Sequence, residues 1–431
     1  DSDLWMGDLV RFPSYLYYYV LSFPVRIAMA FHASDMAIIY LVRLIGLVIG
    51  VLALLVFRRI TQLVTSSLAV QNISLFALSL TGSFVWLAAA ENYDVPSLLL
   101  WFAFLYTSMS LFVKKDARYL YWMAVWFFLL SVTKYTYIPF AGLFGLIAVG
   151  LYAKNNGASK LGQLTHLLRI GISDWLHTLK KWQIALGVVL VVIGAGLFSE
   201  RIIGNLAVYH SFNPSCSSLH SHEACMKFGV YARNYNQKER LANGTVQPIT
   251  YNPPIVGYPS YWVVRYYDSM YVYMGHIYIP SYSFLVELAG ILAAIIGIAV
   301  LILAKVKKIR LFKSQPEFYV FGVVVVLTLL QFMFNVNTIL NYGGQTYAHQ
   351  GRYLLSVVGF AYLLYIIALR RVYKAQSAKI KRLTLWVGAV VAVYAILVAS
   401  AVPSFLIHAE HEGWYSQAAQ NVLPTWLIHR N

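Results

Sequence analysis

The chain has 431 residues, of which 60% are hydrophobic and only 11% are charged. An ordinary globular chain carries about 25% charged residues, so this composition excludes a soluble globular protein and indicates an integral membrane protein. The formal charge of +17 does not indicate nucleic-acid binding, because the basic residues are spaced between apolar runs. The positive-inside rule of membrane proteins accounts for them better.

Apolar segments recur along the chain, each near the roughly 20 helical residues that cross a bilayer core of about 30 Å. They predict an all-α integral membrane protein, a polytopic helical bundle of about ten transmembrane helices. The predicted spans are 36–57, 68–90, 96–113, 119–133, 137–153, 183–200, 283–304, 317–335, 353–370 and 384–403. The fourth and fifth of these are short.

The loops between these spans alternate in charge. The basic loops are Arg58-Arg59, Lys114 to Arg118, 154–182, Lys305 to Lys313 and Arg370 to Arg382. The Lys/Arg bias assigns this side to the cytoplasm and the opposite loops to the exterior. Both ends of the chain then lie outside, so we expect one more helix before Asp1, eleven or more in all, in a protein that starts in the cytoplasm.

The remaining segments complete the predicted organisation. Residues 1–35 form an external first loop, whose aromatic stretch 11–31 is interrupted by Pro13 and Pro24 and predicts a pair of interfacial helices. The basic, amphipathic segment 160–182 predicts a helix on the anionic inner leaflet. The predicted parts are a first loop at 1–35, a transmembrane core at 36–200, an external loop or small lobe at 201–282, a second core at 283–403 and an external tail at 404–431.

Two carboxylates, Glu91 and Asp94, lie in a short predicted external turn that reads ENYD. They are candidates for a general base, or for oxygen ligands of a divalent cation such as Mg²⁺ or Mn²⁺. The alternative is structural, with Asp94 capping the helix that starts near Pro96.

Two cations lie within apolar sequence, where charge is costly and often functional. Lys134 interrupts the apolar region from Tyr119 to Leu151 on the predicted external side. We interpret it as an anion ligand, with a snorkelling lysine as the alternative. Arg43 lies roughly two turns into the first span, either as a ligand or as a partner of an intramembrane acid or carbonyl group.

A further polar cluster, YAHQGRY, precedes the apolar segment that begins at Leu354. Arg352 can bind a phosphate through two parallel hydrogen bonds, and neighbouring glycines let the backbone approach a ligand. His349, Gln350 and Tyr353 are further candidate ligands. The alternative is an interfacial arginine beside an aromatic belt residue.

The only two cysteines, Cys216 and Cys225, fall within one polar loop. Together with His220 and His222 they match the residue types of a zinc site. A disulfide is the simpler prediction in an oxidising external compartment.

Five stretches carry a resemblance to a known family. They are FPSYLYYYVLSFPVRIAMAFHASDMAIIYLVRLIGLV, ENYDVPSLLLWFAFLYTSMSLF, LLSVTKYTYIPF, MYVYMGHIYIP and YAHQGRYLLSVVGFAYLL. In this order they resemble a family of bacterial membrane proteins of unassigned function, which is itself similar to the GT-C glycosyltransferases. The resemblance covers nearly the whole chain, through short and degenerate motifs.

The resemblance implies a multi-span enzyme of the bacterial plasma membrane whose active site opens to the extracytoplasmic side. It implies a polyprenyl-phosphate sugar donor, membrane lipids as surroundings and an extracytoplasmic glycan, lipid or protein acceptor. The catalytic carboxylate would lie in the first external loop, where Asp3 and Asp8 are candidates, or be Glu91 or Asp94. A transporter, flippase or carrier of a lipid-linked anion and a glycan ligase are the alternatives, and the sequence shows no repeat of the kind that transporters often carry.

Overall fold

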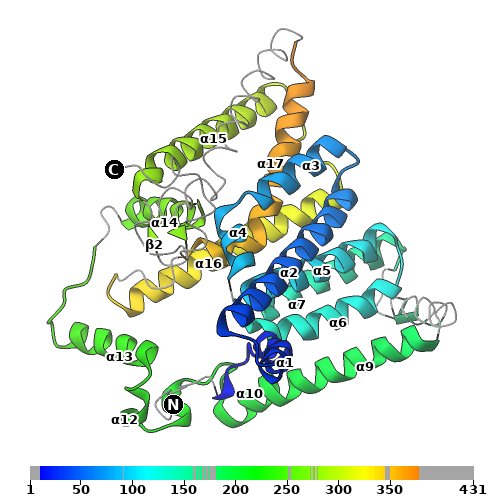
Figure 1. The fold of residues 1–431 in the computed structure, drawn as a ribbon. Coiled ribbons are helices and arrows are strands. Elements are labelled where there is room, and N and C mark those ends of the chain that lie inside the picture. The colour runs from blue at the N-terminus through cyan, green and yellow to red at the C-terminus, as the bar shows by residue number, and fades with distance from the viewer. Residues whose placement is uncertain are drawn as a thin grey trace. The chain divides into compact units, whose positions relative to one another are not determined.

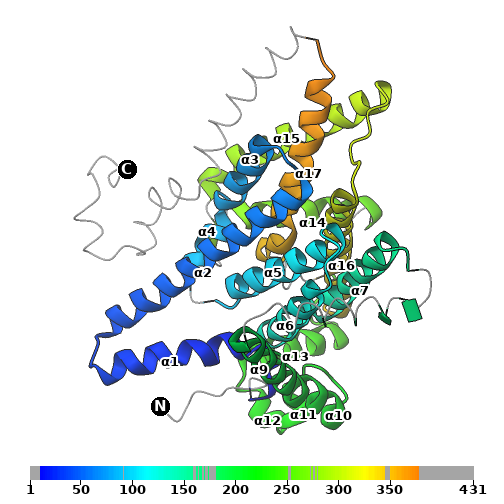
Figure 2. The same cartoon turned by 90° about the vertical axis from the view of Figure 1, so that its right-hand side faces the viewer.

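The computed structural model describes residues 10–90, 92–158, 181–250, 254–271, 273–274, 277–278, 280–344 and 350–377, with scattered positions between 159 and 180. These residues are almost entirely helical (Figures 1 and 2). The strands β1 (Tyr273–Met274) and β2 (Ile277–Tyr278) pair in an antiparallel ladder of two residues each.

Within the described residues, seven helical segments are long and apolar enough to cross a membrane, or eight if one bent pair counts as a single span. The prediction of a polytopic helical membrane protein is therefore confirmed, whereas ten spans are not. The predicted span 119–133 forms the helix α6 (Arg118–Thr133), whose 16 residues extend only about 24 Å at 1.5 Å per residue. The predicted span 384–403 and the tail 404–431 lie outside the described residues.

The chain divides into two compact units, and each is described separately. Unit 1 contains residues 1–64, 91–250 and 332–347. Its helices are α1 (Leu16–Ala30), α2 (Asp35–Val64), α5 (Asp94–Val113), α6, α7 (Ile138–Asn155), α9 (Lys181–Phe198), α10 (Gly204–Tyr209), α11 (Cys216–Leu219), α12 (His222–Cys225) and α13 (Gly229–Ala242). It also contains the 3₁₀ turn η2 (Tyr135–Tyr137), the π-helical turn η3 (Ser199–Ile203) and the end of α16 (Gln315–Asn341).

The core of unit 1 is built around α5, which packs against α2, α6 and α7 (Figure 1). The apolar window of α5 is 83% buried, whereas that of α2 is only 22% buried. Trp101, Phe102 and Phe104 on α5 are among the largest fully buried side chains. A helix that is apolar on all sides suits either a core position or lipid, and here α5 takes the core while α2 leaves an apolar face for lipid.

The first loop differs from its prediction. The expected interfacial helix pair is one helix, α1, that continues through Pro24. A proline ring removes one backbone hydrogen bond and crowds the preceding turn, but it does not always end a helix. The exposed side of α1 is largely apolar, with Tyr19, Phe23 and Ile27, and also carries Arg26.

Unit 2 contains residues 65–90, 251–331 and 348–431. Its described helices are α3 (Leu68–Ser79), α4 (Gly82–Ala89), α14 (Pro254–Tyr271), α15 (Pro280–Val306), most of α16 and α17 (Leu355–Lys374), with the 3₁₀ turn η4 (Gly351–Leu354). The helices α15 and α17 share an apolar cluster formed by Val300, Ala304, Ala368 and Val372.

The predicted span 68–90 is the bent pair of α3 and α4, whose axes meet at 61°. Ser67 caps the start of α3 by accepting a hydrogen bond from the Val70 N–H. At the bend, the Thr81 N–H donates to the Leu78 carbonyl, and the Thr81 hydroxyl donates to the Ala77 carbonyl, which the N–H would use in a continuing helix. Thr81 therefore marks a local break inside the apolar segment.

The predicted lobe 201–282 is not one unit, because the boundary between units falls between residues 250 and 251. The predicted amphipathic helix 160–182 lies largely outside the described residues.

Candidate functional site

Lys134 lies where α6 ends, between Thr133 and the turn η2. Its extended backbone conformation stops the helix, and its side chain is only 10% exposed. The Lys134 Nζ donates to the Asp94 Oδ1 at 2.7 Å, and Asp94 is 6% exposed. Two residues that the sequence singled out separately therefore form one buried ion pair.

Two tyrosine rings flank this ion pair. The Lys134 Nζ lies 5.6 Å from the ring centroids of both Tyr93 and Tyr137. A cation near the faces of aromatic rings gains electrostatic stabilisation that increases as water is excluded. The Tyr137 ring in turn packs on Trp101 of α5, with centroids 5.2 Å apart.

These surroundings set the charge of Lys134. Burial lowers the pKa of its ammonium group, but the Asp94 carboxylate and the two tyrosines outweigh burial and raise the pKa above the usual lysine value. Lys134 therefore stays charged at neutral pH. The helix α5 begins at Asp94, whose backbone N–H donates to the Asn92 side chain.

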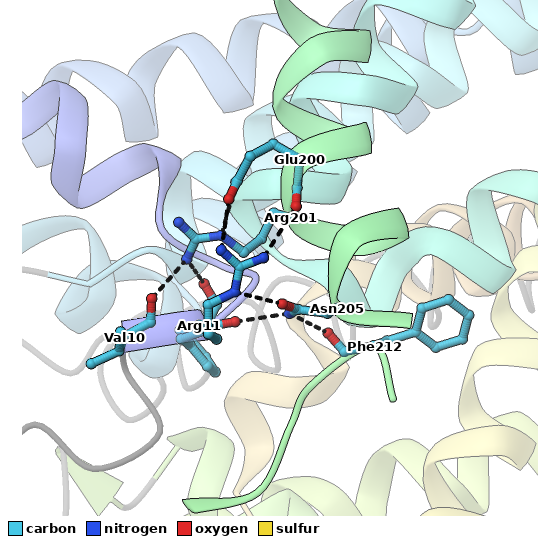
Figure 3. Close-up of polar contacts among 7 residues, drawn as sticks. Val10, Arg11, Glu200, Arg201, Asn205 and Phe212 are labelled. Atoms are coloured by element: carbon cyan, nitrogen blue, oxygen red, sulfur yellow. Dashed lines mark hydrogen bonds and ion pairs between the residues drawn. The ribbon is translucent and has the colours of Figure 1, made fainter. Parts of the chain in front are cut away.

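A second charged cluster forms around η3, the π-helical turn that follows α9 (Figure 3). Arg11 from the first loop donates from Nη1 to the Glu200 Oε1 at 2.7 Å and from Nε to the Asn205 Oδ1 at 2.9 Å. Arg201 bonds the same carboxylate at 3.1 Å. The buried Asn205 amide donates back to the carbonyls of Arg11 and Phe212 at 2.9 and 3.1 Å.

The segment 10–15 connects the two clusters of unit 1. On one side, the Phe12 carbonyl accepts from the Arg201 Nη1 at 3.0 Å, and the Tyr15 ring lies 4.3 Å from the Arg201 guanidinium carbon. On the other side, the buried Ser14 Oγ accepts from the Tyr135 N–H at 3.1 Å, next to Lys134. The first loop is thus held directly beside the Lys134–Asp94 pair.

Sequence reasoning missed the η3 cluster. The available signal was the acid-base pair Glu200-Arg201 at the end of an apolar run on the predicted external side. No sequence signal pointed to Arg11, because its partners Glu200 and Asn205 lie 189 and 194 residues away along the chain. Single-turn π-helices are frequent at functional sites, so this one belongs to the candidate site.

The Arg352 turn belongs to unit 2, so its position relative to Lys134 is not described. The Gly351 N–H in η4 donates to the Ser269 Oγ at 2.5 Å, and a Cβ at Gly351 would lie 2.6 Å from the Met270 nitrogen. Only glycine fits there. The Arg352 guanidinium carbon lies 5.5 Å from the Tyr353 ring centroid.

The turn η4 rests on the last residues of α14, which α4 and α17 also contact. The Ser83 hydroxyl donates to the Met270 carbonyl at 2.9 Å. The Tyr271 and Tyr362 hydroxyls hydrogen bond to each other, and Tyr362 also bonds the Thr81 hydroxyl at 3.2 Å. Hydrogen bonds from α4, α17 and η4 therefore meet at the last turn of α14.

The remaining predicted residues fall into three groups. Asp3, Asp8, Glu91 and His349 lie outside the described residues. Gln350 lies directly before η4, half-buried, while Arg43 is exposed on α2. Cys216 and Cys225 form a disulfide with their Cα atoms 5.7 Å apart, so these thiols are not zinc ligands in this structure.

A divalent cation on Asp94 does not fit the observed geometry. One Asp94 oxygen is taken by the Lys134 ammonium group, which would repel a metal ion. In the part of the chain that the structure describes, no cluster of three or more His, Cys, Asp and Glu side chains could hold a metal. We derive no step through a metal at this position.

No protein-family model matches the chain, nor does any curated protein sequence or solved structure.

Proposed function

We propose that the protein is a membrane glycosyltransferase of the GT-C type that transfers a sugar from a polyprenyl-phosphate donor to an extracytoplasmic glycan, lipid or protein. The buried Lys134–Asp94 ion pair is the observation that carries the proposal. A charge enclosed by a membrane bundle is costly, and such charges usually mark substrate or ion sites. The active face would be extracytoplasmic in a bacterial plasma membrane.

In the proposed reaction, a carboxylate takes the proton of the acceptor hydroxyl, and the oxygen attacks the anomeric carbon. The bond from that carbon to the phosphate oxygen breaks, and the polyprenyl phosphate leaves with the electron pair. A single displacement inverts the anomeric configuration. A fixed cation stabilises the charge that develops on the leaving phosphate, which is often the largest catalytic contribution in a dry site.

The geometry supports one division of these roles among the candidates. Lys134 is suited to the phosphate, because its pKa keeps it charged and aromatic rings hold it. Asp94 is poorly suited to act as the base, because the Lys134 ammonium group occupies one of its oxygens at 2.7 Å and the side chain is buried. We assign Asp94 to positioning Lys134 and leave the base to Asp3, Asp8 or Glu91.

Arg352, His349, Gln350 and Tyr353 remain candidate phosphate or sugar ligands, and Arg43 a candidate lipid-facing cation. Because Arg352 and Lys134 belong to different units, a shared phosphate site is not assumed, and each residue is tested by itself.

A transporter of a lipid-linked anion is the second candidate. The bend between α3 and α4 favours it, because broken helices often line transport sites.

The test uses the purified full chain in liposomes with a radiolabelled polyprenyl-phosphate sugar and a mixture of envelope glycans and lipids as acceptors. We expect label transfer that Lys134→Ala and Arg352→Ala each abolish, and that Lys114→Ala leaves unchanged. Lys114 is a matched control because it is an exposed lysine that contacts two tyrosine rings. Movement of the intact donor across the bilayer without transfer would instead support the transporter.

A further inference from the structure

A carboxylate that the proposed reaction does not use is buried near the end of α14. Asp268 is 7% exposed, and its buried Oδ1 has no hydrogen-bond partner among the residues that the structure describes. Burying an ionised carboxylate without a partner is costly, so nearly all such groups in native proteins are satisfied by protein, water or an ion. Asp268 therefore calls for a partner.

The neighbouring helix α15 approaches α14 closely at this point. The Tyr267 hydroxyl donates to the Val286 carbonyl at 2.7 Å. One turn further along α15, a Cβ at Gly290 would lie 2.8 Å from the Tyr267 ring. These contacts involve the residues directly before Asp268 and Glu287, so the stretches of backbone that carry the two acids lie side by side here.

Among the described residues, the charges that act on Asp268 do not balance. Burial and then the half-buried Glu287 raise the pKa of Asp268, while Arg265, one turn earlier on α14, lowers it. One arginine and two carboxylates leave a formal charge of −1. Like charges in a low-dielectric site are stabilised by a bound cation.

We propose that Asp268 and Glu287 bind one divalent cation of the magnesium class between α14 and the start of α15. Hard divalent cations prefer carboxylate oxygens, and Mg²⁺ typically binds through one or two carboxylates while keeping several waters. Such a site needs only these two side chains.

The position of the site gives it a defined neighbour. Ser269, the residue after Asp268, holds the Gly351 N–H of the turn that carries Arg352. A cation at Asp268 would therefore order the last turn of α14 and, through Ser269, the position of η4. Binding requires no sugar substrate, so the inference stands or falls independently of the proposed transferase activity.

The experiment measures Mn²⁺ binding to the purified full chain in nanodiscs of zwitterionic lipid, from the loss of the free Mn²⁺ paramagnetic resonance signal. We expect saturable binding to one site. Asp268→Asn and Glu287→Gln, both close in shape to the native residues, should each weaken binding on the order of tenfold or more, as loss of a metal ligand or its support does. Glu223→Gln, which neutralises an exposed carboxylate on α12, is the matched control and should bind as the unmodified chain does.

Two outcomes would overturn the inference. One is the absence of saturable Mn²⁺ binding to the unmodified chain. Protonation of Asp268 would then account for its burial in place of a bound cation. The other is unchanged affinity in both Asp268→Asn and Glu287→Gln. Because Glu287 is only half-buried, Glu287→Gln remains informative even if Asp268→Asn fails to fold.

Discussion

The two charged clusters of unit 1 are both built around ion pairs, but their side chains are buried to very different extents. The side chains of Lys134 and Asp94 are 10% and 6% exposed, whereas Glu200, which joins Arg11 and Arg201, is 52% exposed. Removing one member of a buried ion pair leaves the other charge buried and out of contact with water, which is costly. Removing one member of an exposed pair costs little, because water takes its place. The difference favours the Lys134 pair as the centre of the proposed site, with the η3 cluster fastening the first loop beside it.

The largest effect should follow from removing one member of the buried pair. We expect Lys134→Met to lower the free energy of unfolding by about 3–5 kcal/mol, because Asp94 would remain charged and buried. Thermal unfolding in detergent measures the loss. The matched control is Arg118→Met, whose partner Asp116 lies in an exposed turn, with a change of at most about 1 kcal/mol. Equal losses in the two variants would contradict the assigned difference in depth.

A smaller loss should follow from Asn205→Ala. The buried Asn205 amide makes three part-buried hydrogen bonds within the η3 cluster, and losing them should cost about 1–3 kcal/mol in all. Proteolysis of the first loop, compared before and after the substitution, locates the effect. Unchanged protection of that loop would show that this cluster does not fasten it.

Glu200→Gln should have little effect in the same assay. The amide keeps an acceptor for Arg11, and an exposed ion pair contributes only about 0–1 kcal/mol. The small difference from the unmodified chain should shrink further at high salt, because exposed charges are screened. A loss as large as that of Lys134→Met would reverse the ranking of the two clusters.

The pH dependence of the buried pair should be flat around neutrality. A cation whose pKa is raised in the folded state stabilises the protein fully below its unfolded pKa, and this contribution disappears as pH rises through the folded pKa. The difference in unfolding temperature between the unmodified chain and Lys134→Met should therefore stay constant up to about pH 10, near the ordinary lysine pKa, and decrease above it. A decrease near neutral pH would mean that the pKa of Lys134 is lowered instead.

The sequence predicted the parts of this architecture that depend on local composition. The lengths of the apolar segments identified the helices, and the position of Lys134 inside one apolar region marked it as a candidate. Its pairing with Asp94, 40 residues away, depends on how α5 packs against α6, which periodicity does not encode. The sequence therefore indicated two separate candidate ligands where the structure has one ion pair.

The mismatches in the fold also have local causes. Pro24 was expected to break a helix, but α1 continues through it. The apolar stretch 68–90 was expected to be one span, and the structure divides it into two helices that meet at 61°. Apolar length alone does not encode such a bend.

Transfer activity of the double variant Asp94→Leu/Lys134→Met tests the central claim most directly. Replacing both members of a buried ion pair by hydrophobic side chains is often neutral for stability, so this variant should fold while lacking the cation. The account predicts unfolding close to that of the unmodified chain and no sugar transfer from the polyprenyl-phosphate donor. A folded double variant that transfers sugar at the unmodified rate would contradict it, because the pair would then be structural alone.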